Sequence, residues 1–480
     1  MGEPRERMDK REWPRRAFLR AGAGALAAAA LTRCAQGREC RAAGRHPNIV
    51  VVFTDDQGYG DVGCYGAEGY ATPRLDRMAR EGMRFTDFYV AGPVCTPSRA
   101  ALLTGCYPKR LGLAHRVLFP YSDTGLNPNE TTLAEVLRPQ GYATACFGKW
   151  HLGHLAPFMP WQQGFDYYFG VPYSNDMDAH YYKHLDFTAP PLPLYRQQEV
   201  IESGPDQHLL TKRYTEETVR FIEDHADQPF FVYLAHNMPH LPIAASKAFE
   251  GTTEHGLYGD VITEIDWSVG QILDALARLG LDEQTLVVFT SDNGPVVFEG
   301  ERLGYRSGSA GPLRGRKNTT WEGGMREPCL MRWPGHIPAG AVCSELATTM
   351  DLLPTLARLA GSQPPTDRII DGKDILPLMT GQPGAVSPHE AFYYYRDDRL
   401  QAVRSGTWKL HVYRPEWKDA PHPPLLFDLA ADVGETTDVA AAHPDVVTRL
   451  QALADRARQD LGDAVTGQEG SHVRPVGRVE

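Results

Sequence analysis

The apolar run Ile49–Phe53, flanked by Asn48 and Thr54, is followed directly by two aspartates, Asp55 and Asp56. A short, β-branched run of this kind predicts a strand that is buried on both faces, as in a parallel sheet covered by helices. Ligands bind beyond the carboxyl ends of the strands in such sheets. The run therefore predicts that Asp55 and Asp56 lie at a functional edge of the sheet.

Strands and helices alternate over most of the chain. Further strands are predicted at Arg84–Val90, Ala143–Phe147, Phe230–Ala235 and Thr285–Thr290. Helical patterns lie between them at Pro73–Glu81, Leu209–Asp227 and Tyr258–Leu279. This alternation predicts an α/β fold with a large, mostly parallel sheet sandwiched by helices.

The pattern changes near residue 380. The segments Gln401–Tyr413 and Leu425–Leu429 are typical of antiparallel strands, and His443–Leu461 is typical of a helix. We therefore expect a large domain over residues 44–380 and a smaller C-terminal α+β domain with an antiparallel sheet over residues 381–465. Residues 466–480 are expected to form a loose tail.

The first 43 residues predict an export signal. Arg15-Arg16 precedes an Ala-rich apolar run, Ala21–Leu31, which resembles a twin-arginine signal. As a helix this run would rise about 16 Å, too short for a stable membrane span; the alternative is an anchored or frayed terminus. Because Arg33 precedes Cys34 where lipidation signals use a small residue, we expect no lipid anchor. The mature chain is expected to be periplasmic or extracellular.

Net charge and cysteine spacing exclude two classes of protein. The formal net charge is −11 at pH 7, so the chain lacks the basic surface of a nucleic-acid-binding protein. Of 8 cysteines, Cys34 and Cys40 precede residue 44, and the other 6 show no Cys-x-x-Cys spacing. A zinc or thioredoxin-like site is therefore not supported, and disulfide pairing stays open.

A second acidic cluster follows the predicted strand Thr285–Thr290. Ser291-Asp292-Asn293 would reach the same edge of the sheet as Asp55 and Asp56. Aspartates alone often cap turns, but carboxylate and amide oxygens from two strand ends suit a hard cation. Together the clusters favour a metal site.

The segment Val94–Arg99 reads Val-Cys-Thr-Pro-Ser-Arg and leads into an apolar helical stretch. Cys95 would lie at the start of that helix, where free N–H groups favour an anion, and Arg99 would follow one turn later. A lone cysteine is usually a small buried hydrophobe. The spacing Cys95-x-Pro97-x-Arg99 is more specific than a lone cysteine, so it favours a functional role for Cys95.

This spacing resembles the signature of the formylglycine-dependent (type I) sulfatases of the alkaline phosphatase superfamily. Further blocks agree in order: Gly148–Gly153, Phe231–His240, Gly315–Gly324, Ile370–Gly372 and Trp408–His411. The resemblance runs from about Pro47 to Gly462 and is closest to the arylsulfatase A and N-acetylgalactosamine-6-sulfatase branch. It implies an alkaline phosphatase-like fold, with residues 44–380 as the catalytic domain.

The resemblance also implies the cofactors. A formylglycine-generating maturation enzyme would oxidise Cys95, and the hydrated aldehyde would attack sulfur, expel the alcohol and leave a sulfate ester on residue 95. One Ca²⁺ would be bound by residue 95 and four further ligands, namely Asp55, Asp56, Asp292 and Asn293.

Roles for the remaining site residues follow from the same resemblance. Arg99 would steady the nucleophile, and His151 would take a proton so that sulfate is eliminated. Lys149, His240 and Lys317 would hold the sulfate and assist the leaving oxygen. Ser174 would contact the substrate sulfate, and His411 would lie at the edge of the pocket.

Elementary chemistry supports this division of roles. A sulfate monoester carries one negative charge and is weakly basic, so its transition state needs fixed positive charge more than proton transfer. Taken singly, Lys149 and Lys317 are equally compatible with solvated surface charges, and His240 with a loop histidine. Their joint spacing favours an anion site.

The sequence therefore predicts hydrolysis of a sulfate ester, and export and the closest branch favour a sulfated glycan or other sulfated small molecule. The alternative enzyme is a phosphonate monoester or phosphodiester hydrolase, which shares the cysteine signature and metal edge. The blocks Lys149–Gly153 and Lys317–Gly324 favour sulfate. A binding protein that keeps the fold without turnover is the alternative from a different class.

Overall fold

The computed structural model describes residues 46–115, 117–178, 190–297, 308–416 and 422–479. The predicted export signal, residues 1–43, and Cys34 lie outside the described residues. Residues Pro47–Glu480 form one compact unit. Within the described residues, no helix combines the length and apolar character needed to cross a bilayer.

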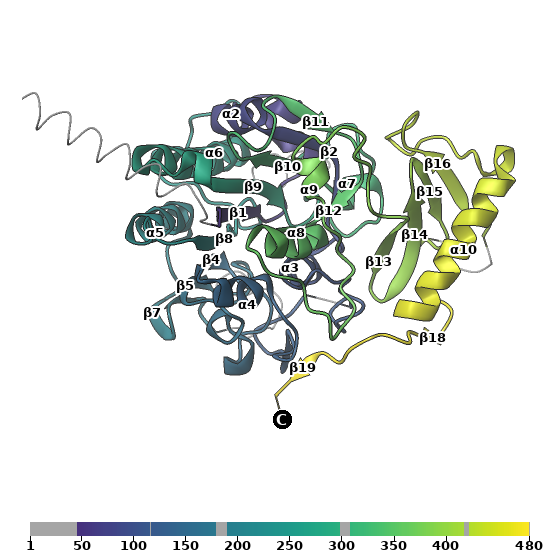
Figure 1. The fold of residues 1–480 in the computed structure, drawn as a ribbon, viewed down its shortest axis with the longest axis horizontal. Helices are drawn as coiled ribbons and strands as arrows, with labels where there is room; N and C mark the ends of the chain where they lie inside the picture. Colours follow the sequence, from purple (N-terminus) through teal and green to yellow (C-terminus); the bar gives the residue numbers. More distant parts are fainter. Residues whose placement is uncertain (1–45, 116, 179–189, 298–307, 417–421, 480) are drawn as a thin grey trace, which may run out of the picture. The chain divides into compact units, whose positions relative to one another are not determined.

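A large mixed sheet carries the fold (Figure 1). Its strand order is β11-β2-β10-β9-β1-β8-β4-β5-β6-β7, with β12 beside β2. The strands are β1 (Asn48–Thr54), β2 (Met83–Tyr89), β4 (Ala143–Lys149), β5 (Tyr167–Val171), β6 (Pro193–Arg196), β7 (Glu199–Ser203), β8 (Phe230–Ala235), β9 (Thr285–Ser291), β10 (Arg326–Arg332), β11 (Ala341–Cys343) and β12 (Ala347–Thr348).

The centre of this sheet is parallel, as the sequence predicts. β1 lies between β8 and β9 and is parallel to both, and β4 is parallel to β8 and β5. β10 instead runs antiparallel to β9 and β2. A parallel neighbour requires a crossover connection, usually a helix. Among the described residues between β9 and β10, the only α-helix is the four-residue α7 (Glu322–Met325).

Helices cover both faces of the large sheet (Figure 1). Val50 and Val52 pack in a cluster with α2 (Pro73–Glu81), α5 (Leu210–Asp224) and α6 (Leu257–Leu279). Ile49, Val51 and Phe53 face the opposite cluster. Its helices are α3 (Cys95–Thr104), α4 (Leu133–Leu137), α8 (Leu352–Leu359) and α9 (Leu376–Met379). Alternate residues of β1 thus point to opposite sides, which explains its continuous apolar run.

A second sheet lies in the C-terminal region. Its antiparallel order is β13-β14-β15-β16, with bounds Phe392–Arg396, Arg399–Ser405, Trp408–His411 and Leu425–Asp428. Helix α10 (Pro444–Leu461) packs against β14 and β15 (Figure 1). The predicted strand Gln401–Tyr413 is in fact a hairpin, because the chain turns at Gly406, whose φ is +59°.

An apolar cluster joins the two sheets. Tyr89, Met325 and Met350 from the large part pack with Phe392 and Leu410 of the second sheet. α10 contributes apolar residues to the same cluster. The C-terminal sheet is therefore held against the carboxyl-end side of β2 by buried contacts.

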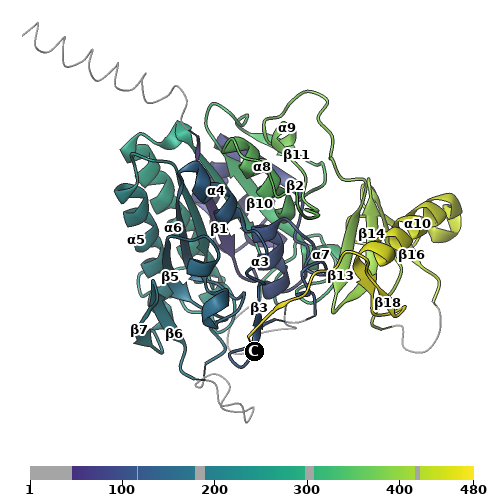
Figure 2. The same ribbon diagram turned by 60° about the horizontal axis from the view of Figure 1, so that its bottom comes forward.

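The last residues correct one prediction, because 466–480 are not a loose tail in the part that the structure describes. β18 (Gln468–Glu469) pairs with β17 (Gly462–Asp463), and β19 (Gly477–Arg478) pairs with β3 (Thr124–Gly125). Arg474 is anchored by an ion pair to Glu130, with Nε 2.7 Å from Oε1. The chain thus returns to the large part of the protein after α10 (Figure 2).

Candidate active site

The two acidic clusters meet at one edge of the large sheet, as predicted. β1 and β9 are in register at Thr54 and Ser291, so the residues that follow lie side by side. The Asp56 amide donates to Asp292 Oδ1 over 3.1 Å. Asn293 Nδ2 donates to Asp56 Oδ1 over 2.8 Å. These bonds hold three of the predicted metal ligands, Asp56, Asp292 and Asn293, around one point.

The donor set at this point fits a hard cation. Asp55, Asp56 and Asp292 are buried, and within the described residues Asp56 Oδ2 and Asn293 Oδ1 have no hydrogen-bond partner. One ligand atom from each of four residues, Asp55, Asp56, Cys95 and His240, lies within 4.8 Å of the others. Burial and the Asp55 charge raise the pKa of Asp292 to about 7, whereas Lys149, His240 and Arg99 outweigh burial and hold the pKa of Asp55 well below its usual range. Oxygen ligands of this kind suit a divalent cation such as Ca²⁺.

Cys95 begins α3, directly after the extended residue Val94. Its thiol donates to Asp55 Oδ1 over 3.4 Å. Burial, with a further contribution from the Asp55 charge, raises the pKa of the Cys95 thiol well above its usual range. Unmodified Cys95 therefore stays protonated at neutral pH and is a poor nucleophile, because the thiolate is the reactive form.

Arg99, one turn further along α3, bridges the strand ends. Its Nη2 lies 2.7 Å from Asp292 Oδ2 and 3.4 Å from Asp55 Oδ2. Its Nη1 donates to the Lys149 carbonyl over 3.0 Å. The guanidinium therefore holds the start of α3 against three strands of the sheet.

Two lysines bring further positive charge to the same point. Lys149 Nζ lies 2.5 Å from Asp55 Oδ2 and donates to Ser174 Oγ over 3.1 Å. Lys317 Nζ lies 2.5 Å from Asp56 Oδ1 and 3.7 Å from Cys95 Sγ. Burial acts to lower the pKa of each ammonium, but the neighbouring carboxylates outweigh burial and raise it. Both lysines therefore stay charged.

The backbone at the end of β4 delivers Lys149 to the site. Gly148 has a φ of +95°, and a Cβ at this position would lie 1.9 Å from the Ala235 carbonyl oxygen. Only glycine adopts this conformation without strain, and only glycine allows so close an approach of β8. The requirement for glycine at position 148, the first residue of the block Gly148–Gly153, thus has a structural explanation.

His151 is positioned as a neutral proton acceptor. Its Nε2 lies 2.8 Å from the Leu118 carbonyl oxygen, so the ring proton is assigned to Nε2. Its Nδ1 is buried and has no partner among the described residues. Burial, reinforced by Lys149 and Arg99, holds the pKa of His151 well below its usual range. The Nδ1 lone pair is therefore available.

His240 lies on the loop after β8. Its Nδ1 donates to the Leu241 carbonyl over 2.6 Å, and its Nε2 lies 3.6 Å from Asp56 Oδ2. Its side chain is 12% exposed, so it is accessible from the cavity that it lines. His240 and Lys317 therefore flank Asp56.

A cavity of about 310 Å³ opens over this cluster. Five predicted site residues line it: Cys95, His151, Ser174, His240 and Lys317. The sequence analysis missed other lining residues, which are His115, Val117, Phe119, Asp176, Met177, Asn318 and Asp397. These come from loops and from the β13–β14 turn, where no motif distinguishes them from ordinary surface residues.

His411 is not among the residues that line this cavity, contrary to the expectation of a pocket-edge role. It is fully buried, its Nε2 lies 3.0 Å from Glu435 Oε1, and its ring lies 4.4 Å from that of Trp321. β15 carries it into the packing between the second sheet and the segment Gly315–Gly324. His411 therefore packs against that segment through Trp321 and does not line the cavity.

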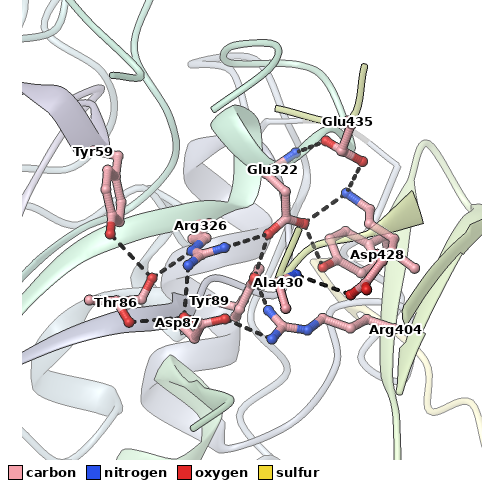
Figure 3. Close-up of polar contacts among 12 residues, drawn as sticks. Tyr59, Thr86, Asp87, Tyr89, Glu322, Arg326, Arg404, Asp428, Ala430 and Glu435 are labelled. Carbon is pink, nitrogen blue, oxygen red and sulfur yellow. Dashed lines mark hydrogen bonds and ion pairs between the residues drawn. The ribbon is translucent and has the colours of Figure 1, made fainter. Parts of the chain in front are cut away.

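A buried charge network links the two sheets (Figure 3). Asp87 of β2 accepts from Arg326 of β10 and Arg404 of β14, each over 2.7 Å. Lys409 of β15 pairs with Glu322 over 2.8 Å and donates to the Thr320 carbonyl over 2.9 Å. The second sheet thus holds the segment that carries Lys317.

Comparisons with known proteins agree with this geometry. Residues 47–362 match the family described as Sulfatase, and residues 387–475 match the C-terminal region of aryl-sulfatase. The chain is 39% identical to N-acetylgalactosamine-6-sulfatase of Canis lupus familiaris, over 91% of this chain and 90% of that protein. It is 41% identical to arylsulfatase A of Homo sapiens, over 88% of this chain and 90% of that protein.

Solved structures are similar as well. Ps i-CgsB in complex with k-i-k-neocarrahexaose matches with a TM-score of 0.74 and 30% identity, over 86% of this chain and 92% of that chain. The phosphonate monoester hydrolase of Agrobacterium radiobacter matches with a TM-score of 0.61 and 20% identity, over 86% of this chain and 96% of that chain. The second likeness shows the shared fold alone.

The protein therefore belongs to the sulfatase family. Its activity is that of a sulfuric ester hydrolase, as the sequence analysis predicts.

Proposed function

We propose that the protein hydrolyses a carbohydrate sulfate ester, with residue 95 in its formylglycine form and one bound Ca²⁺. The observation that carries this proposal is the convergence of Arg99, Lys149, His240 and Lys317 on the buried cluster of Asp55, Asp56 and Cys95. The carbohydrate class is supported by the names of two similar proteins, N-acetylgalactosamine-6-sulfatase and a structure in complex with neocarrahexaose.

The two cofactors supply chemistry that the unmodified chain lacks. Formylglycine hydrate would supply a hydroxyl nucleophile and a second hydroxyl on the same carbon, whose deprotonation allows that carbon to release sulfate. Ca²⁺, held by Asp55, Asp56, Asp292 and Asn293, would supply Lewis acidity and a template for the nonbridging sulfate oxygens.

Fixed cations would hold the substrate sulfate. Lys317 Nζ lies 3.7 Å from Cys95 Sγ, and Lys149 Nζ is within hydrogen-bond distance of Ser174 Oγ, which lines the cavity. Their charges stabilise negative charge on the sulfate oxygens in a site that largely excludes water. His240, on the cavity side of Asp56, is placed to assist the leaving oxygen.

His151 would act as the proton acceptor in release of the product. Its Nδ1 is the nitrogen with an available lone pair, and its low pKa keeps the ring neutral. The neutral ring is therefore available to accept a proton from the hydroxyl that remains on residue 95.

Location and maturation complete the proposal. The twin-arginine-type segment within residues 1–43 favours export to the periplasm or beyond, and a formylglycine-generating enzyme would be the partner that oxidises Cys95. Replacing both Arg15 and Arg16 by Lys is expected to keep a fused reporter in the cytoplasm. Undiminished export of that variant would refute the proposed twin-arginine export signal.

The main test uses the full chain produced together with a formylglycine-generating enzyme. Peptide mass should show oxidation of residue 95, elemental analysis should show one Ca²⁺ per chain, and a panel of sulfated sugars should release sulfate. Cys95→Ala should release none, and a chelator should abolish turnover until Ca²⁺ is restored. Equal turnover by Cys95→Ala would reject the role of residue 95.

A further inference from the structure

The cavity is lined by residues of two kinds. Cys95, His151 and Lys317 belong to the sulfate site, whereas Val117, Phe119 and Met177 add apolar surface. The Phe119 ring stacks on Tyr121 with ring centroids 5.2 Å apart and an interplanar angle of 4°. Aromatic and aliphatic surface of this kind suits the C–H face of a ring.

Asp397 adds a carboxylate to this cavity, from the C-terminal sheet. It occupies the two-residue turn between β13 and β14, because Arg396 and Arg399 are paired on either side. Asp397 and Asp398 have φ values of +49° and +63°. Two consecutive positive φ values are typical of the tight hairpin turn that matches strand twist.

The neighbouring residue anchors this turn to the large part of the protein. Asp398 Oδ1 lies 2.9 Å from Lys109 Nζ, and Asp398 Oδ2 lies 3.6 Å from His115 Nδ1. The Asp398 carbonyl accepts from the Ala464 amide over 2.9 Å. These contacts hold the turn in place, and Asp397 is the turn residue that lines the cavity.

A carboxylate in this cavity does not bind the substrate's sulfate group, because both are negatively charged. Asp397 Oδ2 lies 3.4 Å from Arg396 Nε, and an ionised carboxylate repels the oxygens of a sulfate group. A carboxylate has two oxygens that accept hydrogen bonds and no donor when ionised. Its natural partners are hydroxyl groups, and adjacent hydroxyls of a sugar can bind both oxygens.

We infer that Asp397 is a specificity-determining residue that binds the free hydroxyls of the leaving group, and that the substrate is a sulfated hexose ring. This inference rests on the proposed function and specifies its substrate class. The apolar residues Val117, Phe119 and Met177 contact the ring, and Asp397 accepts from its hydroxyls.

The test compares Asp397→Asn with wild type and with Asp367→Asn as a control, because Asp367 is exposed and does not line the cavity. Asn tolerates positive φ, so Asp397→Asn keeps the turn. Each protein, with residue 95 oxidised, is assayed on an aryl sulfate and on a panel of monosulfated hexoses. Inhibition of aryl sulfate turnover by unsulfated methyl hexosides is measured as well.

Asp397→Asn is expected to lower kcat/KM on the best monosulfated hexose about tenfold or more, because it loses hydrogen bonds to a charged acceptor. Turnover of the aryl sulfate should stay within about twofold, since that substrate offers no hydroxyls. The inhibition by methyl hexosides should weaken as well. Asp367→Asn should leave the ratio between sugar and aryl substrates unchanged.

Equal losses on sugar and aryl substrates would show that Asp397 is structural and would overturn the inference. So would unchanged kinetics, or a wild-type protein that cleaves aryl sulfate but no monosulfated hexose; in these cases the proposed sulfate chemistry stands. If oxidised wild type cleaves no sulfate ester, the proposed function itself fails.

Discussion

Lys409 Nζ lies 2.8 Å from Glu322 Oε1 and 2.9 Å from Glu435 Oε1, and all three side chains are fully buried. The same ammonium donates to the Thr320 carbonyl, three residues after Lys317. Lys409 belongs to the second sheet, whereas Glu322 and Thr320 belong to the segment that reaches the site. The active site therefore depends on both sheets, although only the large one carries the metal ligands.

Replacing Lys409 by Met is expected to lower the free energy of unfolding by about 3–5 kcal/mol, because it leaves buried carboxylates without their cation. Denaturant unfolding measures this loss. Arg456→Gln is the matched control, since its ion pair with Glu390 is exposed and should contribute less than about 1 kcal/mol. Similar small effects of both substitutions would contradict the importance of the buried network.

Gly148→Ala should impair both folding and activity, because its Cβ would clash with the Ala235 carbonyl oxygen and displace Lys149. Gly141→Ala provides the comparison. Gly141 also has a positive φ, +82°, but a Cβ there meets nothing within 4 Å. Kinetics on an aryl sulfate and thermal unfolding should show a much larger effect at residue 148. Equal effects would mean that φ alone, and not the approach of β8, requires glycine.

His151→Asn should lower kcat about 10²- to 10⁴-fold and change KM little, because the amide cannot accept a proton. Asn also tolerates the φ of +59° at this position. His154→Asn tests whether any nearby histidine has this effect, since His154 does not line the cavity. Steady-state kinetics on an aryl sulfate give kcat and KM for both variants. A decrease of less than about tenfold for His151→Asn would exclude it as the base.

His236 should make stability depend on pH. It is fully buried, its Nε2 lies 3.1 Å from Ser268 Oγ, and burial lowers its pKa to about 3. Below the unfolded pKa of about 6.5, the unfolded chain binds a proton that the folded chain does not. Stability should therefore fall as pH decreases from about 6.5 toward 3, by about 2 kcal/mol at pH 5 from this group.

The measurement compares wild type with His236→Gln by denaturant unfolding at pH 7.5 and pH 5. The substitution should cost stability at pH 7.5 through lost packing, and it should cost about 2 kcal/mol less at pH 5. An equal cost of His236→Gln at both pH values would contradict a buried neutral histidine.

The sequence was sufficient to predict the parallel centre of the large sheet and the meeting of the acidic clusters. Ile49–Phe53 is apolar on both faces, which only a covered strand satisfies, and Asp55 and Asp292 follow strands that prove to be neighbours. The positions of Cys95, Arg99 and Lys317 were predictable because their spacing matches a family motif.

Other features depended on contacts that no local pattern encodes. β19 pairs with β3 across more than half of the chain, so the C-terminal residues had no local sign of being ordered. Trp408–His411 matched a family block, but the match could not show that His411 faces Glu435 and not the cavity. Asp397 reaches the cavity only through the packing of one sheet against another.

The most direct test of the whole account compares initial rates on an aryl sulfate and an aryl phosphonate ester with the same leaving group. The protein is used with residue 95 confirmed as oxidised, and Cys95→Ala is the control. The account predicts faster sulfate cleavage that is lost in Cys95→Ala. Faster phosphonate cleavage by the same oxidised protein would contradict it, and Lys149 and Lys317 would then be assigned to phosphoryl oxygens.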